Sequence, residues 1–174
     1  AVSIYSNLAS SYRQLSDMDE AIDEYKQALK YTTSPKDSLT ILNNIANIYS
    51  ENGNLKKALS VFDLILPKNF GNYLDFRVAD NYYFTLWLED KRDVSANLEE
   101  ILYKRKSVRD LEGQMSSYDH LIRYYWDIEP EKALDYSFKY FELTKNLKNT
   151  SDEKRALKYL IALASSESSR EYSM

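Results

Sequence analysis

The sequence of 174 residues contains no cysteine, one histidine, three glycines and three prolines. Without cysteine there is neither a disulfide framework nor a cysteine-ligated metal site. So few glycines and prolines leave little turn chemistry for a chain of many short strands, and they therefore favour helices joined by short turns. No run approaches the roughly 18 consecutive apolar residues that mark a membrane span, so we expect no membrane insertion of this segment.

Positive charge is not in excess either: 23 basic residues face 27 acidic ones, which gives a net charge of −4. Nucleic-acid binding needs a concentrated positive field, so we expect no nucleic-acid partner. The one basic cluster consists of Lys104, Arg105, Lys106 and Arg109. We interpret this cluster as a solvated helix end, where cations complement the helix dipole.

What is present is an internal repeat with a period of 37 to 38 residues. Large apolar, alanine and tyrosine positions recur in the same order. The first copy comprises Tyr5, Leu8, Ala9, Tyr12, Ala21 and Tyr25, and the second comprises Leu42, Ile45, Ala46, Tyr49, Ala58 and Phe62. Two weaker copies follow, one with Tyr83, Phe84, Trp87 and Ala96, the other with Tyr118, Leu121, Ile122, Tyr125 and Ala133. Such a period is typical of stacked helix pairs, in which alanines permit close helix contact and aromatic rings fill the grooves beside them.

The pattern predicts helices at about residues 2–15, 17–31, 36–51 and 55–66 for the two clear copies. Gly53 falls between the third and fourth of these helices, where a left-handed residue closes a helix without a Cβ penalty. A ninth helix is expected after Thr150, ending in a turn at residues 165–169. The expected organisation is a single domain over residues 1–174, with repeats at 2–35, 36–71, 72–109 and 110–149 and a half repeat at 150–174. Because a half repeat cannot bury its apolar face alone, we expect the chain to be a fragment of a longer protein.

These residue types and spacings resemble the tetratricopeptide repeat family, whose signature places Trp, Leu, Gly and Tyr on a first helix and Ala and Phe on a second. The resemblance covers essentially the whole chain. It implies an all-α fold, a right-handed superhelical solenoid of antiparallel helix pairs with about nine helices. It also implies that the first helix of each pair lines a concave groove that holds a peptide or partner segment.

In that register, the groove carries mainly uncharged polar side chains. An asparagine amide offers both a donor and an acceptor, and can therefore bind a peptide main chain of any sequence. The alternative interpretation is that these residues merely tolerate solvent on an exposed face. The candidate partner-binding residues are Asn7, Ser10, Asn43, Asn44, Asn47, Asn81, Tyr82, Thr85, His120, Arg123 and Trp126.

Some members of the family bind the tails of chaperones. In these proteins, Lys and Asn side chains of successive repeats hold the terminal carboxylate of the tail. At the matching positions this chain has Ser6, Ser10, Asn44, Val78 and Tyr82, of which only Asn44 conforms. We therefore do not expect binding to chaperone tails.

We expect no enzyme, cofactor or metal site. His120 follows Asp119 directly, and adjacent residues on a helix point about 100° apart, so the two do not form a catalytic pair by themselves. Asp17 and Asp19 have the spacing that opens a calcium loop, but Ile22 and Ala28 stand where that loop requires Gly and Glu.

The leading hypothesis is a non-catalytic scaffold that binds a protein segment in the groove. One alternative is a structural spacer or a homodimer formed through exposed terminal helices. Another is a small-molecule sensor, with a pocket between the third and fourth repeats formed by Tyr82, Tyr83, Phe84, Trp87, Tyr124, Tyr125 and Trp126. The degenerate repeats also resemble, loosely, those of bacterial membrane-anchored signalling regulators, which implies a sensor or adaptor role in the bacterial periplasm or cytoplasm.

Overall fold

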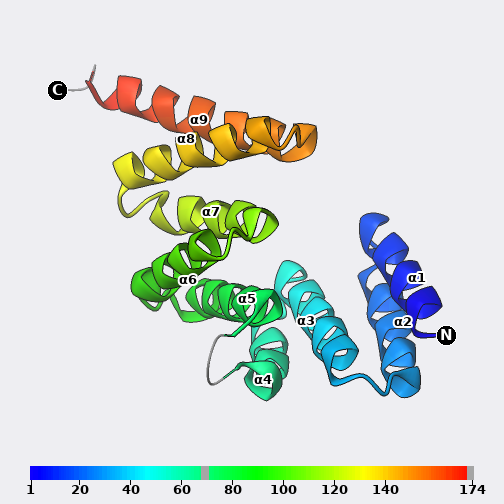
Figure 1. Cartoon of the computed structure of the whole chain (residues 1–174). Coiled ribbons are helices and arrows are strands. Elements are labelled where there is room, and N and C mark those ends of the chain that lie inside the picture. The colour runs from blue at the N-terminus through cyan, green and yellow to red at the C-terminus, as the bar shows by residue number, and fades with distance from the viewer. Residues whose placement is uncertain (68–70, 172–174) are drawn as a thin grey trace. The chain divides into compact units, whose positions relative to one another are not determined.

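The computed structural model describes residues 1–67 and 71–171, with side chains described as far as Ser165. These residues form nine α-helices and no strand, which confirms the all-α prediction. In chain order (Figure 1) the helices are α1 (Val2–Gln14), α2 (Met18–Tyr31), α3 (Pro35–Glu51), α4 (Leu55–Ile65), α5 (Tyr73–Asp90), α6 (Ser95–Ser107), α7 (Leu111–Tyr125), α8 (Pro130–Asn146) and α9 (Thr150–Glu171).

The predicted helix boundaries in the first two pairs agree with the structure to within two residues. Gly53 has the expected positive φ, at 75°. The same turn in the first pair uses Ser16, 37 residues earlier, with a φ of 66°. Pro35 begins α3 instead of ending the preceding unit, because Ser34 caps the helix by accepting a hydrogen bond from the Asp37 amide at 3.2 Å.

The turn expected at residues 165–169 is wrong, since α9 continues to Glu171. No glycine or proline interrupts this helix, and serine is tolerated within one. α9 begins at Thr150 itself, one residue earlier than expected. Asn149 is the capping residue: its side-chain Oδ1 atom accepts a hydrogen bond from the Asp152 backbone amide at 3.1 Å, and its Nδ2 atom donates to the Asp152 carboxylate at 2.8 Å.

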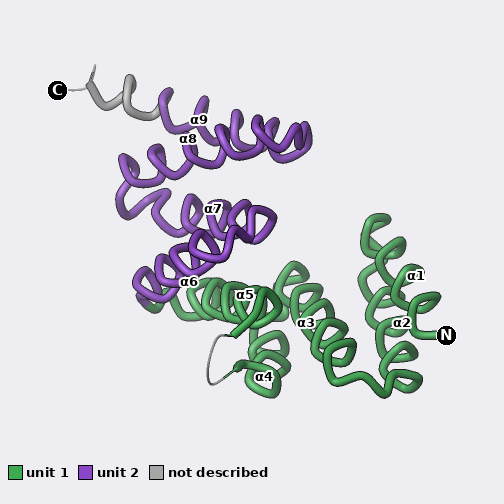
Figure 2. The backbone as a smooth tube through the Cα atoms, in the orientation of Figure 1, with its two compact units in different colours: residues 1–92 green, residues 93–174 purple. Residues whose placement is uncertain are grey.

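The chain forms two compact units, residues 1–92 and residues 93–174 (Figure 2). The boundary lies between α5 and α6, inside the predicted third repeat. The predicted small contact residue of that repeat, Ala96, is exposed, whereas Ala21, Ala58 and Ala133 are fully buried. The single domain over residues 1–174 stays a prediction.

The first unit contains two clusters of buried residues. In one, Ala9, Ala21 and Tyr25 of the first helix pair pack with Ile41, Ile45 and Ile48 of α3. In the other, Ala46, Ala58 and Phe62 pack with Val78 of α5. Both clusters follow the predicted pairing of small residues with large ones.

The core of the second unit takes buried apolar residues from all four of its helices. They include Leu98 and Ile101 of α6, Leu121 and Ile122 of α7, Ala133 and Tyr140 of α8, and Ala156 and Leu163 of α9. In this unit the repeated apolar positions Tyr118, Leu121, Ile122, Tyr125 and Ala133 are all buried.

The basic cluster is not uniformly solvated, and that prediction is wrong for Arg105. This side chain is 1% exposed, and its guanidinium donates to the carbonyl of Gly113 and, at 3.0 Å, to the Ser117 hydroxyl. The carboxylate of Asp110 lies 3.6 Å from its Nε atom. A buried cation requires such partners, so Arg105 fastens α6 to α7.

Candidate partner-binding surface

The candidate residues of the first unit lie on α1, α3 and α5. These are the first helices of the repeats, as the repeat register predicts. The buried Tyr25 of α2 organises part of this surface. Its hydroxyl lies 3.0 Å from the Ser10 hydroxyl of α1 and accepts a hydrogen bond from the Asn44 amide of α3 at 3.2 Å. One tyrosine thus joins three helices and fixes two candidate side chains.

Asn43 and Thr85 were expected on the accessible surface, but the structure buries them. Asn43 is 0% exposed and accepts a hydrogen bond from the Asn81 amide at 3.1 Å. Thr85 is 2% exposed, and its hydroxyl lies 3.0 Å from that of Ser50. Both contacts join α3 to α5. These two side chains connect neighbouring repeats and are not open to a ligand.

The remaining asparagines on this surface are accessible to different degrees. Asn7 is exposed, whereas Asn44, Asn47 and Asn81 are half-buried. The side chain of Asn47 makes no hydrogen bond to any of the described residues. At one edge of the surface, Arg13 of α1 forms a bidentate ion pair with Glu51 of α3, with 3.0 Å between Nε and Oε2.

Tyr82 packs into the cluster around Phe62 instead of projecting freely. Its ring meets the Phe62 ring edge-on, with 6.3 Å between centroids, and lies 5.2 Å from that of Tyr83. Burial, together with the negative charge of Asp63, raises the pKa of the Tyr82 phenol. Two other aromatic residues of α5 also pack against each other: the ring centroids of Phe84 and Trp87 are 5.4 Å apart.

In the second unit, two of the three remaining candidates lie on α7 and the third, Trp126, directly follows it as the C-cap. His120 is half-buried, and Arg123 lies 3.8 Å from Asp119 on the same helix. The Trp126 ring meets the Tyr159 ring of α9 at 5.8 Å, in an edge-on geometry. This part of the surface is aromatic and charged, unlike the amide-rich surface of α1 and α3.

The Asp119 carboxylate interacts with residues of α9. It accepts a hydrogen bond from the Tyr159 hydroxyl at 2.8 Å and lies 3.8 Å from the Arg155 guanidinium, both on α9. Burial and the nearby Asp119 carboxylate raise the pKa of Tyr159. Asp119 therefore serves to join α7 to α9.

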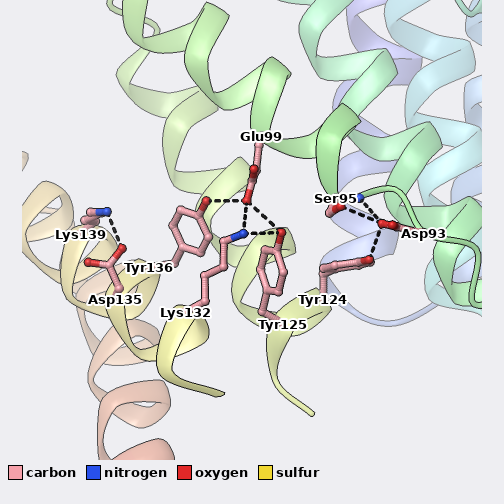
Figure 3. Close-up of polar contacts among 9 residues, drawn as sticks. All are labelled: Asp93, Ser95, Glu99, Tyr124, Tyr125, Lys132, Asp135, Tyr136 and Lys139. Atoms are coloured by element: carbon pink, nitrogen blue, oxygen red, sulfur yellow. Dashed lines mark hydrogen bonds and ion pairs between the residues drawn. The ribbon is translucent and has the colours of Figure 1, made fainter. Parts of the chain in front are cut away.

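A polar cluster that the sequence did not indicate joins α6, α7 and α8 (Figure 3). The Glu99 carboxylate accepts hydrogen bonds from the hydroxyls of Tyr125 at 2.8 Å and Tyr136 at 3.1 Å. Lys132 lies 2.7 Å from the same oxygen and donates to Tyr125 at 2.8 Å. Burial opposes both charges. The mutual hydrogen bonds nevertheless lower the pKa of Glu99 and raise that of Lys132, so both groups stay ionised.

A second polar cluster, also drawn in Figure 3, surrounds Asp93 just before α6. One carboxylate oxygen accepts hydrogen bonds from the Tyr124 hydroxyl at 2.7 Å, the Ser95 amide at 2.9 Å and the Ser95 hydroxyl at 2.7 Å. These three donors lower the pKa of Asp93 to about 2. Burial, and then the bond to Asp93, raises that of Tyr124 to about 12.

Both clusters are built from residues far apart in sequence, so no local pattern reveals them. The one available signal is the spacing of Asp93 and Ser95, which is typical of a side chain that accepts from the backbone two residues on. Through these hydrogen bonds and the ion pair, both clusters hold neighbouring helices together.

Two findings concern other kinds of site. Among the described residues, no group of three or more His, Cys, Asp or Glu side chains is placed to hold a metal ion. Over the same part of the chain, no helix combines the length and the apolar character of a membrane span.

Comparison with known proteins bears on the fold and the family. Residues 1–66 match the model of a family described as Tetratricopeptide repeat. None of the curated proteins matches the chain. The fold is similar to that in a solved structure described as the crystal structure of MamA protein. The TM-score is 0.51 and the sequence identity 17%, with 98% of this chain and 94% of that one covered. At this identity the similarity supports the all-α fold and nothing beyond it.

Proposed function

Residues 1–66 match the tetratricopeptide repeat family, and from that premise we propose that the chain is a non-catalytic scaffold that binds a peptide or partner segment on the polar surface of the first helix of each pair. In the first unit the proposed contact residues are Asn7, Ser10, Asn44, Asn47 and Asn81. In the second unit they are His120, Arg123 and Trp126. Tyr82 could contribute only the accessible edge of its ring, and Asn43 and Thr85 are excluded because they are buried.

The observation that carries the proposal is Asn47. Asparagine is a middling helix former, so its presence in a helix calls for another reason. For Asn43 that reason is the hydrogen bond with Asn81, and for Asn44 it is the hydrogen bond to Tyr25. Asn47 is half-buried on the same helix and has no such partner among the described residues. A ligand main chain would satisfy both its donor and its acceptor.

The polar contacts around the surface support preorganisation. Asn44 is held by Tyr25, and its amide carbonyl makes no hydrogen bond within the described residues, so an acceptor is presented in a fixed position. A side chain that is already ordered loses less conformational entropy when a ligand binds. This arrangement suits an extended segment recognised through its backbone.

The non-catalytic part of the proposal is supported by the engagement of Asp119. Because its carboxylate bonds to Tyr159 and lies near two arginines, it does not orient the neighbouring His120 as a general base. The further expectation of a sensor or adaptor role in a bacterial signalling regulator rests on the loose sequence resemblance alone.

The test is peptide selection from a displayed random library with the intact chain, followed by affinity measurements. The Asn44→Ala, Asn47→Ala double variant should bind the selected peptides at least about tenfold more weakly, which corresponds to roughly 1.4 kcal/mol. Asn47→Ala alone removes no hydrogen bond within the protein and isolates the ligand contact. Asn97→Ala, a half-buried amide on α6, is the matched control. Equal affinities for all four proteins would rule out this surface.

A further inference from the structure

Two arginines of the second unit, Arg123 on α7 and Arg155 on α9, approach the same carboxylate. The Nη1 atom of Arg123 lies 3.8 Å from Oδ2 of Asp119, and the Nη1 atom of Arg155 lies 3.8 Å from its Oδ1. The two guanidinium groups are therefore neighbours, although they come from different helices. Both remain accessible, since 45% of the Arg123 side chain and 53% of the Arg155 side chain are exposed.

The carboxylates beside Arg155 accept their hydrogen bonds from other groups. Asp119 accepts from the Tyr159 hydroxyl at 2.8 Å. Asp152, which lies 3.6 Å from the Arg155 guanidinium, accepts from the Tyr140 hydroxyl at 2.7 Å. At 3.6 and 3.8 Å, Arg155 attracts both carboxylates without donating a hydrogen bond to either of them.

Arg155 differs in this respect from the arginines that hold helices of this protein together. Arg105 is buried and donates to two groups of α7, and Arg13 forms a bidentate ion pair with Glu51. The Arg155 guanidinium donates to none of the described residues. A guanidinium carries five N–H donors in a planar fork that matches the two oxygens of a carboxylate. Arg155 can therefore offer this fork to a ligand.

The accessibility of the charges around this pair suits an anionic ligand. The Asp119 and Asp152 side chains are only 14% and 23% exposed, whereas the two arginines are far more exposed. The four charges cancel in sum, but a group that approaches from solvent meets the guanidinium groups first. Because the Coulomb energy falls with distance, attraction by the nearer arginines exceeds repulsion by the carboxylates behind them. The same carboxylates hold the arginines in place, which lowers the entropy that a ligand must remove.

We infer that Arg123 and Arg155 bind the carboxylate of an aspartate or glutamate side chain in the partner segment. The inference rests on the proposed function, in which Arg123 is a contact residue, and it specifies the chemistry of the bound segment. The site differs from the clamp for a terminal carboxylate, because the positions that match that clamp all lie in the first unit. We therefore assign a side chain within the segment and not its C-terminus.

The test uses peptides selected from a displayed random library with the intact chain. Each peptide is fused to the display protein through its C-terminus, so that it presents no free terminal carboxylate. We expect aspartate or glutamate to be enriched at one position. An acetylated and amidated synthetic peptide of the selected sequence should bind at least about tenfold more tightly than its counterpart with asparagine or glutamine at that position.

The protein variants test whether the two arginines recognise this group. With Arg155→Gln or with Arg123→Gln, the acidic peptide and its amide counterpart should differ in affinity by less than about twofold, because the partner of the carboxylate is gone. Arg92→Gln is the matched control: this arginine is 62% exposed and pairs with Asp90, so the preference for the acidic peptide should persist. Two separate arginine variants keep the test valid if one of them does not fold.

The outcomes separate this inference from the proposed function. If the selected peptides lose affinity for the Asn44→Ala, Asn47→Ala variant but show no acidic preference, or keep it with both arginine variants, only the inference is wrong. If no peptide is selected, both are wrong. A preference that requires a free C-terminal carboxylate would overturn the inference. So would a phosphoserine peptide that binds more than about tenfold more tightly than the glutamate peptide.

Discussion

At some positions the space for a single atom determines which residue type fits, and Gly113 on α7 is the clearest example. A Cβ atom at this residue would lie 2.0 Å from a carboxylate oxygen of Asp110 and 2.8 Å from the Nε atom of Arg105. The Gly113 amide donates to the other Asp110 oxygen at 2.9 Å, which caps α7. The missing side chain therefore makes room for both the helix cap and the buried cation.

We predict that Gly113→Ala destabilises the protein by about 1–3 kcal/mol, because the added methyl group displaces Asp110 from its cap and crowds Arg105. The sign is opposite to helix propensity, which favours alanine over glycine by about 1 kcal/mol. Urea denaturation measures the difference. Gly71→Ala is the control, since its Cβ atom would meet Asp75 at an ordinary 3.7 Å. A more stable Gly113→Ala variant would contradict the packing around Arg105.

The hydrogen bonds to Asp93 predict a dependence of stability on pH. In the folded state its pKa is about 2, below the usual 3.8. The stabilisation is therefore complete above about pH 4 and is lost as the pH falls towards 2. Tyr124→Phe removes one donor, so its deficit in unfolding free energy should be present at pH 7 and shrink between pH 4 and pH 2.

Urea denaturation at several pH values measures this deficit. Tyr103→Phe, at a 72% exposed tyrosine on α6, is the control. A deficit that stays constant from pH 7 to pH 2 would show that the Tyr124 hydroxyl does not act through the Asp93 carboxylate.

At the scale of the elements, the helix pairs depend on small residues at their crossings. Ala9 and Ala21 are fully buried between α1 and α2, and Ala58 occupies the place equivalent to Ala21 one repeat later. The degenerate third repeat shows the contrast. Phe84 stands where the clear repeats have Ala9 and Ala46, Ala96 is exposed, and the boundary between the two units falls between α5 and α6.

We predict that Ala21→Leu costs about 1–3 kcal/mol, because three more carbon atoms must enter a contact with no space for them. The thermal midpoint measures the loss. Ala96→Leu makes the same chemical change at an exposed alanine and should leave the midpoint nearly unchanged. An unchanged midpoint for Ala21→Leu would mean that α1 and α2 do not meet at this residue.

At the scale of the whole molecule, each compact unit has its own buried core. The clusters around Tyr25 and Phe62 are contained within residues 1–92. In repeat proteins, stability is approximately a sum over units and their neighbouring contacts, so a unit with its own core can fold alone.

We predict that the fragments 1–92 and 93–174 each fold into helical domains with cooperative thermal transitions. Circular dichroism measures the helix content and the transition of each fragment against the intact chain. If either fragment gives the spectrum of a random coil while the intact chain is helical, the two units are not independent folding units.

The period of 37 to 38 residues by itself determined the fold class, the boundaries of the first four helices to within two residues, and the burial of Ala9, Ala21, Ala46, Ala58 and Ala133. It did so because helix pairs with a repeating apolar face bury that face by stacking, and Gly53 marks a turn through its own backbone chemistry. The repeat register also correctly placed Asn7, Asn44 and Asn47 on one series of helices.

Only the tertiary structure decided which polar side chains form hydrogen bonds within the protein. Whether Asn43 faces solvent depends on Asn81, 38 residues away, and whether Arg105 is solvated depends on Gly113 and Ser117 of the next helix. The partners of Glu99 and Asp93 likewise come from other helices. Local periodicity shows how apolar a position is. Whether a polar side chain has a hydrogen-bond partner depends on a second residue, and the two meet only when their helices pack.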